Sequence, residues 1–260
     1  GNVNSITVFL GLPGGLATSV NYPISGDASI TAIAVGDFNE DGKPDLVATG
    51  NSGSISVFLG NGDGTFQSQV AWPGGGTPLF VGDFNRDGHA DIAGGGVVLF
   101  GNGDGTFSSQ VTTAANGSSN LVMADFNGDG LQDFAGINYS GTNTYVEAFP
   151  GNGDGTFAAA PKYLLGSASG SLGSPTVQSM VARDLNGDGK TDLILTTVTY
   201  YASGVNVGSA FSQSLVVLLG NGDGTFHAES AYTISGTPGP AVVADFNGDG
   251  INDIGVTEAA

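Results

Sequence analysis

The chain has 260 residues, 40% of them hydrophobic, which is enough to build a sizeable core, and no apolar run approaches the roughly 18 residues of a membrane-spanning helix. Its 24 acidic and 5 basic residues give a formal charge of −19, which excludes nucleic acid and membrane insertion as favoured interactions. Glycine is abundant, with 46 residues, and strong helix formers are scarce, so turns and strands are expected. Cysteine is absent, which rules out a disulfide framework.

Short apolar runs of strand length follow one another along the whole chain, separated by turn residues. Two such runs, 5–10 and 17–22, open the chain, and two more, 241–245 and 253–256, close it. Between them lie units with four runs each. In the first unit these are 32–38, 45–50, 55–60 and 68–72. The sequence therefore predicts an all-β protein.

Two patterns repeat and alternate along the sequence. The pattern D-x-N-x-D-G-x-x-D occurs five times, at 37–45, 83–91, 125–133, 184–192 and 245–253. The pattern GNGDGTF occurs four times unchanged, at 60–66, 101–107, 151–157 and 220–226. A degenerate copy of the second pattern, GLPGGL, lies at 11–16.

A repeat of about 40–60 residues that holds four strands is typical of a propeller blade. We predict a single five-bladed β-propeller with blades at 25–73, 74–115, 116–166, 167–235, and 236–260 completed by 1–24. Because unpaired sheet edges favour aggregation, the terminal strands are expected to share this last blade and close the ring. Residues 6–10 should then pair with the strand near Ile254.

The combination of DFNGDG-type loops with GNGDGTF turns resembles the FG-GAP/VCBS repeat family, the integrin-α-like calcium-binding β-propellers. The resemblance covers essentially the whole chain. It implies a propeller with calcium in the loops between the first and second strands, and a role in adhesion or ligand binding. Integrin-type members have seven blades, whereas this sequence supplies five. The chain is therefore either a complete five-bladed member or a part of something larger.

The nine-residue pattern also has the chemistry of a calcium loop, because it presents hard oxygen ligands at alternate positions around a glycine bend. Side-chain ligands are expected at positions 1, 3, 5 and 9, and a backbone carbonyl at position 7, where the side chain varies. The predicted ligands are Asp37, Asn39, Asp41, Lys43 and Asp45; Asp83, Asn85, Asp87, His89 and Asp91; Asp125, Asn127, Asp129, Leu131 and Asp133; Asp184, Asn186, Asp188, Lys190 and Asp192; and Asp245, Asn247, Asp249, Ile251 and Asp253.

Neither an EF-hand nor simple turn preference accounts for this pattern as well as a calcium loop does. An EF-hand loop needs Glu at position 12, and none of the five loops has it. Turn preference alone would not place three Asp and one Asn in the same register five times. We expect about five Ca²⁺ ions, one per blade, which would reduce the formal charge from −19 to −9. The Asp of each GNGDGTF turn is expected to cap that turn instead of binding metal.

Repeated aromatic residues are open to two interpretations. Tyr22, Trp72, Tyr163 and Tyr232 occupy equivalent places after the turns, where they could pack between blades or stack on sugars; packing is favoured because the feature recurs in most blades. The Phe residues of the DFN and GTF motifs are expected in the core.

The sequence predicts no enzyme, because only two histidines occur and no nucleophile motif is present. Irregular insertions occur at 137–145, 165–177 and 197–214 and should lie on the face of the propeller opposite the calcium loops. They either form a ligand-binding face or are extra loop length that the fold tolerates without a function. The candidate ligand-binding residues are Tyr139, Tyr145, Tyr200, Tyr201 and Phe211.

These features favour an extracellular or cell-surface module that binds a glycan or protein surface without catalysis. The alternative is a structural building block of a larger surface protein or filament, with self-assembly in place of a soluble ligand.

Overall fold

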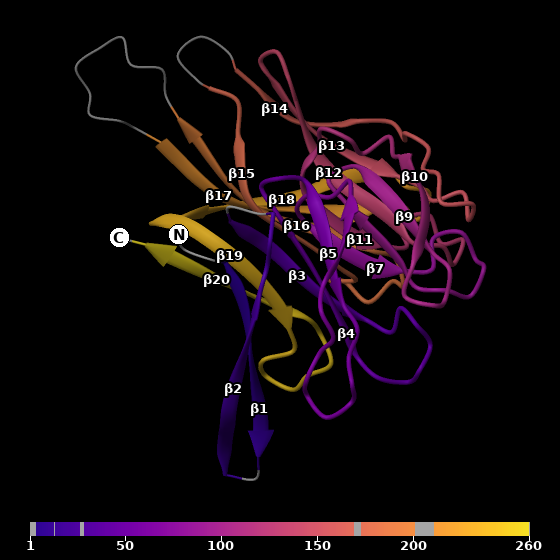
Figure 1. Cartoon of the computed structure of the whole chain (residues 1–260). Helices are drawn as coiled ribbons and strands as arrows, with labels where there is room; N and C mark the ends of the chain where they lie inside the picture. Colours follow the sequence, from indigo (N-terminus) through magenta and orange to yellow (C-terminus); the bar gives the residue numbers. More distant parts are fainter. Residues whose placement is uncertain (1–3, 13, 27–28, 169–172, 201–210, 260) are drawn as a thin grey trace. The chain divides into compact units, whose positions relative to one another are not determined.

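The computed structural model describes residues 4–12, 14–26, 29–168, 173–200 and 211–259. Within these ranges the regular secondary structure is entirely β, as the sequence predicts (Figure 1). No helix that could cross a membrane occurs in this part of the chain.

Most strands form four-stranded antiparallel sheets in which consecutive strands are neighbours. The first sheet contains β3 (Ile30–Gly36), β4 (Asp45–Gly50), β5 (Ser54–Phe58) and β6 (Val70–Pro73); the second contains β7 (Leu79–Gly82), β8 (Asp91–Gly94), β9 (Val97–Gly101) and β10 (Phe107–Thr112). The third contains β11 (Ser119–Ala124), β12 (Asp133–Ser140), β13 (Asn143–Phe149) and β14 (Tyr163–Ser167); the fourth contains β15 (Thr176–Arg183), β16 (Asp192–Tyr200), β17 (Phe211–Gly220) and β18 (Phe226–Ile234). Each sheet is a meander typical of propeller blades.

The two ends of the chain form separate hairpins. Strand β1 (Ser5–Leu12) pairs with β2 (Gly15–Pro23), and β19 (Thr237–Ala244) pairs with β20 (Asp253–Ala259). In the described residues these are two-stranded sheets. The predicted pairing of residues 6–10 with the strand near Ile254 would join the two units described below and stays a prediction. Each hairpin packs against the neighbouring sheet of its own unit.

The chain divides into two structural units. The first comprises residues 1–116 with 153–156, and the second comprises 117–152 with 157–260. In the first unit, Phe38 and Val47 of the first sheet pack with Ile92 and Phe107 of the second. The N-terminal hairpin adds a smaller cluster around Ile6, next to the first sheet.

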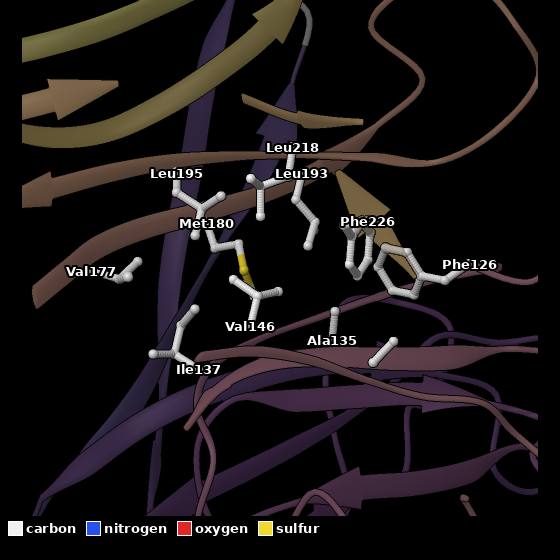
Figure 2. Close-up of a cluster of buried hydrophobic side chains, with 11 residues drawn as sticks. Phe126, Ala135, Ile137, Val146, Val177, Met180, Leu193, Leu195, Leu218 and Phe226 are labelled. Atoms are coloured by element: carbon white, nitrogen blue, oxygen red, sulfur yellow. The ribbon is translucent and has the colours of Figure 1, made fainter. Parts of the chain in front are cut away.

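The core of the second unit lies between the third and fourth sheets (Figure 2). Ile137 and Val146 of the third sheet meet Leu193, Leu195 and Leu218 of the fourth. Strand β16 is buried over Asp192–Val198, because one face covers this core and the other faces the C-terminal hairpin. That double burial explains the three consecutive apolar residues Leu193, Ile194 and Leu195, where a one-sided strand would alternate.

The predicted insertions lie partly in regular structure. Residues 137–145 extend β12 and β13 into a long hairpin, and residues 197–200 and 211–214 lengthen β16 and β17. Backbone pairing in these segments continues the sheet ladder, so they are not simple loops.

Candidate functional site

The five D-x-N-x-D-G-x-x-D segments connect the first and second strands of the four four-stranded sheets and the two strands of the C-terminal hairpin. The carboxylate at position 1 holds the bend. Asp37 accepts hydrogen bonds from Asp41 N (3.2 Å) and Gly42 N (3.0 Å). In the fifth loop, Asp245 accepts from Gly250 N (2.8 Å). The first Asp therefore fixes the backbone on which the later ligand positions lie.

Positions 3 and 5 add two further Asx-type bonds. Asn39 Oδ1 accepts from Asp41 N (3.2 Å), and Asp41 Oδ1 accepts from Lys43 N (3.0 Å). The Lys43 ammonium also pairs with Asp41 Oδ2 (3.0 Å). These bonds gather the side chains of positions 1, 3 and 5 around one tight bend.

The backbone of the loops is left-handed at two positions. Position 6 is always glycine, and position 4 is glycine in the last three loops. In the first two loops, position 4 is Glu40, with φ of 57°, and Arg86, with φ of 62°. A non-glycine residue incurs a steric penalty in this region, so the loop geometry is imposed by the pattern as a whole.

The aspartate at position 9 has a role that the sequence did not reveal. Asp45, Asp91, Asp133 and Asp192 are completely buried. In the second sheet, Asp91 accepts from Phe84 N (2.8 Å) inside its own loop and from Gly101 N (2.8 Å) at the start of the GNGDGTF turn. This carboxylate ties the candidate metal loop to the turn. The repeated co-occurrence of the two patterns was the signal that could have indicated such a link.

The GNGDGTF turns are built around this junction. Asp63 accepts from Thr65 N (2.9 Å) and Thr65 Oγ1 (2.6 Å), which confirms its predicted capping role. The first glycine is required because a Cβ at Gly60 would lie 2.1 Å from Pro44 O. Thr65, through its side-chain and backbone hydrogen bonds, lowers the pKa of Asp63. The turn is thus shaped to approach the loop closely.

Turns also bond to the loop of the preceding sheet within each unit. Gly105 N donates to Phe38 O (2.8 Å) in the first unit, and Gly224 N donates to Phe126 O (3.0 Å) in the second. Loops and turns of neighbouring sheets are therefore joined by backbone hydrogen bonds.

Carboxylates in these loops repel one another. Burial raises the pKa of Asp91, and the charges of Asp87 and Asp83 add to that increase, while bonds from Gly101 N and Phe84 N oppose it. The pKa of Asp133 is raised for the same reasons, with Asp129 and Asp125 as the charged neighbours. A bound cation would relieve this repulsion.

The donor chemistry of the loops fits calcium, because carboxylate, carboxamide and carbonyl oxygens are the hard ligands that Ca²⁺ prefers. Among the residues with described positions, no three acidic or histidine side chains already converge on a metal-binding geometry. Their oxygens accept N–H bonds from the loop itself. The calcium ligand sets stay a prediction.

The candidate ligand-binding residues with described side chains lie near the strand ends opposite the candidate calcium loops, and a ligand face formed by them stays a prediction. Tyr139 lies on the face of the third sheet that meets the fourth, and its hydroxyl accepts from Val177 N (3.1 Å). Tyr145 lies on the opposite face of that sheet. Tyr139 pairs with Thr144, and the side chains of successive strand residues alternate between faces. Tyr200 is 55% exposed at the end of β16. Tyr201 lies outside the described residues, and only the backbone of Phe211 is described.

The repeated aromatics take different environments. Tyr22 packs edge-on against Phe66, with ring centroids 5.4 Å apart, and Trp72 packs against Phe107 at 5.6 Å, as predicted for residues between sheets. Tyr163 is half-buried beside the core of the second unit, whereas Tyr232 is 54% exposed. Packing thus explains the first three residues, and the prediction is wrong for Tyr232.

The repeats define a β-sheet repeat protein with an oxygen-rich loop at one end of each four-stranded sheet and of the C-terminal hairpin. The FG-GAP-like repeat family matches residues 37–94, 125–195 and 198–256, and the chain belongs to this family. No curated protein sequence matches the chain significantly.

Solved structures that are similar to the chain include a biofilm matrix protein and a BBS1N chain. The Vibrio cholerae biofilm matrix protein Bap1 is 19% identical with a TM-score of 0.44, and the match covers 87% of this chain and 34% of Bap1. The BBS1N chain in complex with ARL6DN is 12% identical with a TM-score of 0.42, and the match covers 90% of this chain and 77% of that one. The chain thus spans about a third of the length of Bap1.

Proposed function

We propose that the chain is a calcium-stabilised propeller module that acts outside the cell as a non-catalytic adhesion or recognition unit for a glycan or protein surface. The observation that carries this proposal is the five-fold recurrence of one loop, with the same donor types in the same register and the same internal hydrogen bonds. A turn that served only to reverse the chain would not need three carboxylates each time.

Calcium would act as a folding cofactor in this module. Positions 1, 3, 5 and 9 would supply side-chain oxygens, and position 7 a carbonyl. Sites with dissociation constants of roughly 10⁻⁴–10⁻³ M are filled outside cells and empty in cytosol, which supports an extracellular setting. At ten times its dissociation constant, the ion stabilises the fold by about 1.4 kcal/mol for each site.

The calcium proposal is tested by thermal and urea unfolding in excess chelator, in Ca²⁺ and in Mg²⁺. Unfolding free energy should rise in Ca²⁺, and less in Mg²⁺, which demands a stricter octahedral geometry. No change between chelator and Ca²⁺ would refute it. The substitution Asp129→Asn is a matched probe, because Oδ1 can still accept from Leu131 N (2.8 Å) while the charge is lost. It should remove one bound ion and about 1.4 kcal/mol of the calcium effect.

The proposed module is a five-bladed ring in which the two terminal hairpins complete one blade. The last loop supports this. Asp253 accepts from Phe246 N (3.0 Å) and is only half-buried, whereas its four counterparts are fully buried and also hold a turn glycine. Phe246 is 62% exposed, whereas Phe126 is 2% exposed. Both differences are expected if the last blade needs strands from the N-terminus.

Alanine substitution tests ring closure. Phe126→Ala should cost about 3–5 kcal/mol, as is usual for a buried Phe. Phe246→Ala should cost a similar amount if the ring closes in solution. A cost near zero for Phe246→Ala would show that this side chain stays exposed and that no ring forms.

The alternative function is a structural building block with no soluble ligand. A glycan array combined with mass photometry separates the two. Binding to array components by a monomeric protein supports recognition, whereas self-assembly without any array binding supports the structural role.

A further inference from the structure

A solvent-open cavity of about 340 Å³ lies in the second unit, between β14 of the third sheet and β16–β18 of the fourth. Five of the nine described lining residues carry a hydroxyl: Tyr163, Thr197, Thr199, Ser214 and Ser230. Strand alternation turns the side chains of Thr197, Thr199 and Ser214 toward the core face, and that of Ser230 toward the opposite face. The other four described lining residues are apolar, and none of the nine that the structure describes is charged. This volume lies at the lower end of the range for small-molecule sites.

One wall of the cavity is fixed by bonds to the third sheet. Pro175 O accepts from Thr144 Oγ1 (2.7 Å), and the following strand is held where Val177 N donates to Tyr139 Oη (3.1 Å). Gly166 lets this wall approach, because a Cβ there would lie 2.7 Å from Pro175 Cγ. A wall held in this way costs little to order when a ligand binds.

Three of the lining residues pack against the buried core cluster of the second unit. Leu165 and Val216 line the cavity and pack against that core cluster. Tyr163 also packs against the core while bordering the open space. In the first unit the equivalent aromatic, Trp72, is instead packed on Phe107. Tyr163 therefore borders a cavity in the second unit, whereas the equivalent Trp72 packs against the core of the first unit.

The lining chemistry selects among ligand classes. An ion entering this site would lose its hydration without an opposite charge to compensate it, which is costly. A purely apolar group would leave the hydroxyls without their water partners, at about 1–3 kcal/mol for each group buried unpaired. A neutral sugar ring can form hydrogen bonds between its own hydroxyls and those of the cavity lining. Its C–H faces can pack against the apolar walls and the tyrosine ring.

We propose that this cavity, bordered by the hydroxyl side chains of Tyr163, Thr197, Thr199 and Ser214 between the third and fourth sheets, binds one ring of a neutral saccharide. The inference rests on the proposed recognition function and assigns it a ligand class and a site. That site differs from the tyrosine face expected from the sequence, because Thr199 and Tyr200 are adjacent in β16 and point to opposite faces of the strand.

The test is a titration of the full chain in calcium with glucose, galactose, mannose and fucose, followed by calorimetry and by saturation-transfer NMR. Glucuronic acid is the charged comparison. We expect at least one neutral sugar to bind, and glucuronic acid to bind more weakly. Thr199→Trp, which fills the cavity, should weaken binding at least tenfold, and Tyr200→Ala, its matched neighbour, should leave binding unchanged.

Two conservative variants guard against loss of folding. Ser214→Ala and Thr199→Val each remove one hydroxyl from the lining and should weaken binding several-fold with an unchanged Tm. Equal binding by wild type and all three cavity variants would overturn the site assignment, as would preferential binding of glucuronic acid or no neutral sugar binding at all.

Failure of this inference is distinguishable from failure of the proposed function. If Tyr200→Ala abolishes binding and Thr199→Trp does not, recognition stands and the ligand occupies the tyrosine face. If the folded, calcium-stabilised protein binds nothing on a glycan or protein array and self-assembles, the recognition function itself is wrong.

Discussion

Removing the buried carboxylate of Asp91 should destabilise the protein even when no calcium is present. The side chain is 0% exposed and accepts from Phe84 N and Gly101 N, both at 2.8 Å. In Asp91→Ala these two buried donors lose their acceptor. An unsatisfied buried donor costs about 1–3 kcal/mol, so the substitution should cost about 2–6 kcal/mol of a typical total of 5–15 kcal/mol.

The assay is urea unfolding in excess chelator, followed by circular dichroism. Asp87→Ala is the matched control, because Asp87 lies in the same loop and its carboxylate accepts from His89 N (2.9 Å) at an exposed site. It should cost less than about 1 kcal/mol without metal. Asp91→Asn keeps one acceptor oxygen and should cost about 1–3 kcal/mol, and it serves if the alanine variant does not fold.

Unfolding in chelator separates a structural role of position 9 from a role in metal binding alone. If Asp91 acted only as a metal ligand, Asp91→Ala and wild type would unfold at the same urea concentration in chelator. The structural role would be refuted if the unfolding free energies of Asp91→Ala and wild type differed by less than about 0.5 kcal/mol in chelator but by much more in calcium.

Local geometry supports three more predictions. Arg86→Gly should raise the unfolding free energy by about 0.5 kcal/mol, because it relieves a φ of 62°. Gly128→Ala at the same loop position should lower the unfolding free energy by about 1 kcal/mol. A lower urea midpoint for Arg86→Gly, or a higher one for Gly128→Ala, would contradict this. Thr156 lowers the pKa of Asp154 from 3.8, so its stabilisation is present above pH 3.8 and lost as pH falls through the folded pKa. The Tm difference between wild type and Asp154→Asn in chelator should therefore shrink from about pH 6 to about pH 3, and a constant difference would oppose the assignment. Deletion of residues 1–10 removes Ile6 from its cluster and should lower Tm and promote aggregation, measured by light scattering; an unchanged Tm would argue against a role for the hairpin.

The order of strands, loops and turns could be predicted from sequence because each depends on neighbours in the chain. Alternating apolar residues define a strand locally, and the loop bends through bonds between residues two to five apart, such as those from Gly42 N to Asp37. The GNGDGTF cap is equally local, since Asp63 and Thr65 are two residues apart. The sequence by itself therefore determined the all-β class, the repeat register and the candidate calcium ligands.

Only the tertiary structure decided what lies between repeats. Asp91 and Gly101 are ten residues apart, and Pro175 meets Thr144 across 31 residues, so neither contact has a local sequence pattern. The cavity beside Tyr163 lies between two sheets, whereas the equivalent Trp72 meets Phe107 and fills its space. Equivalent residues in a repeat have the same local preferences, but the side chains facing them belong to another repeat, and packing against that partner determines whether the position becomes core or an open site.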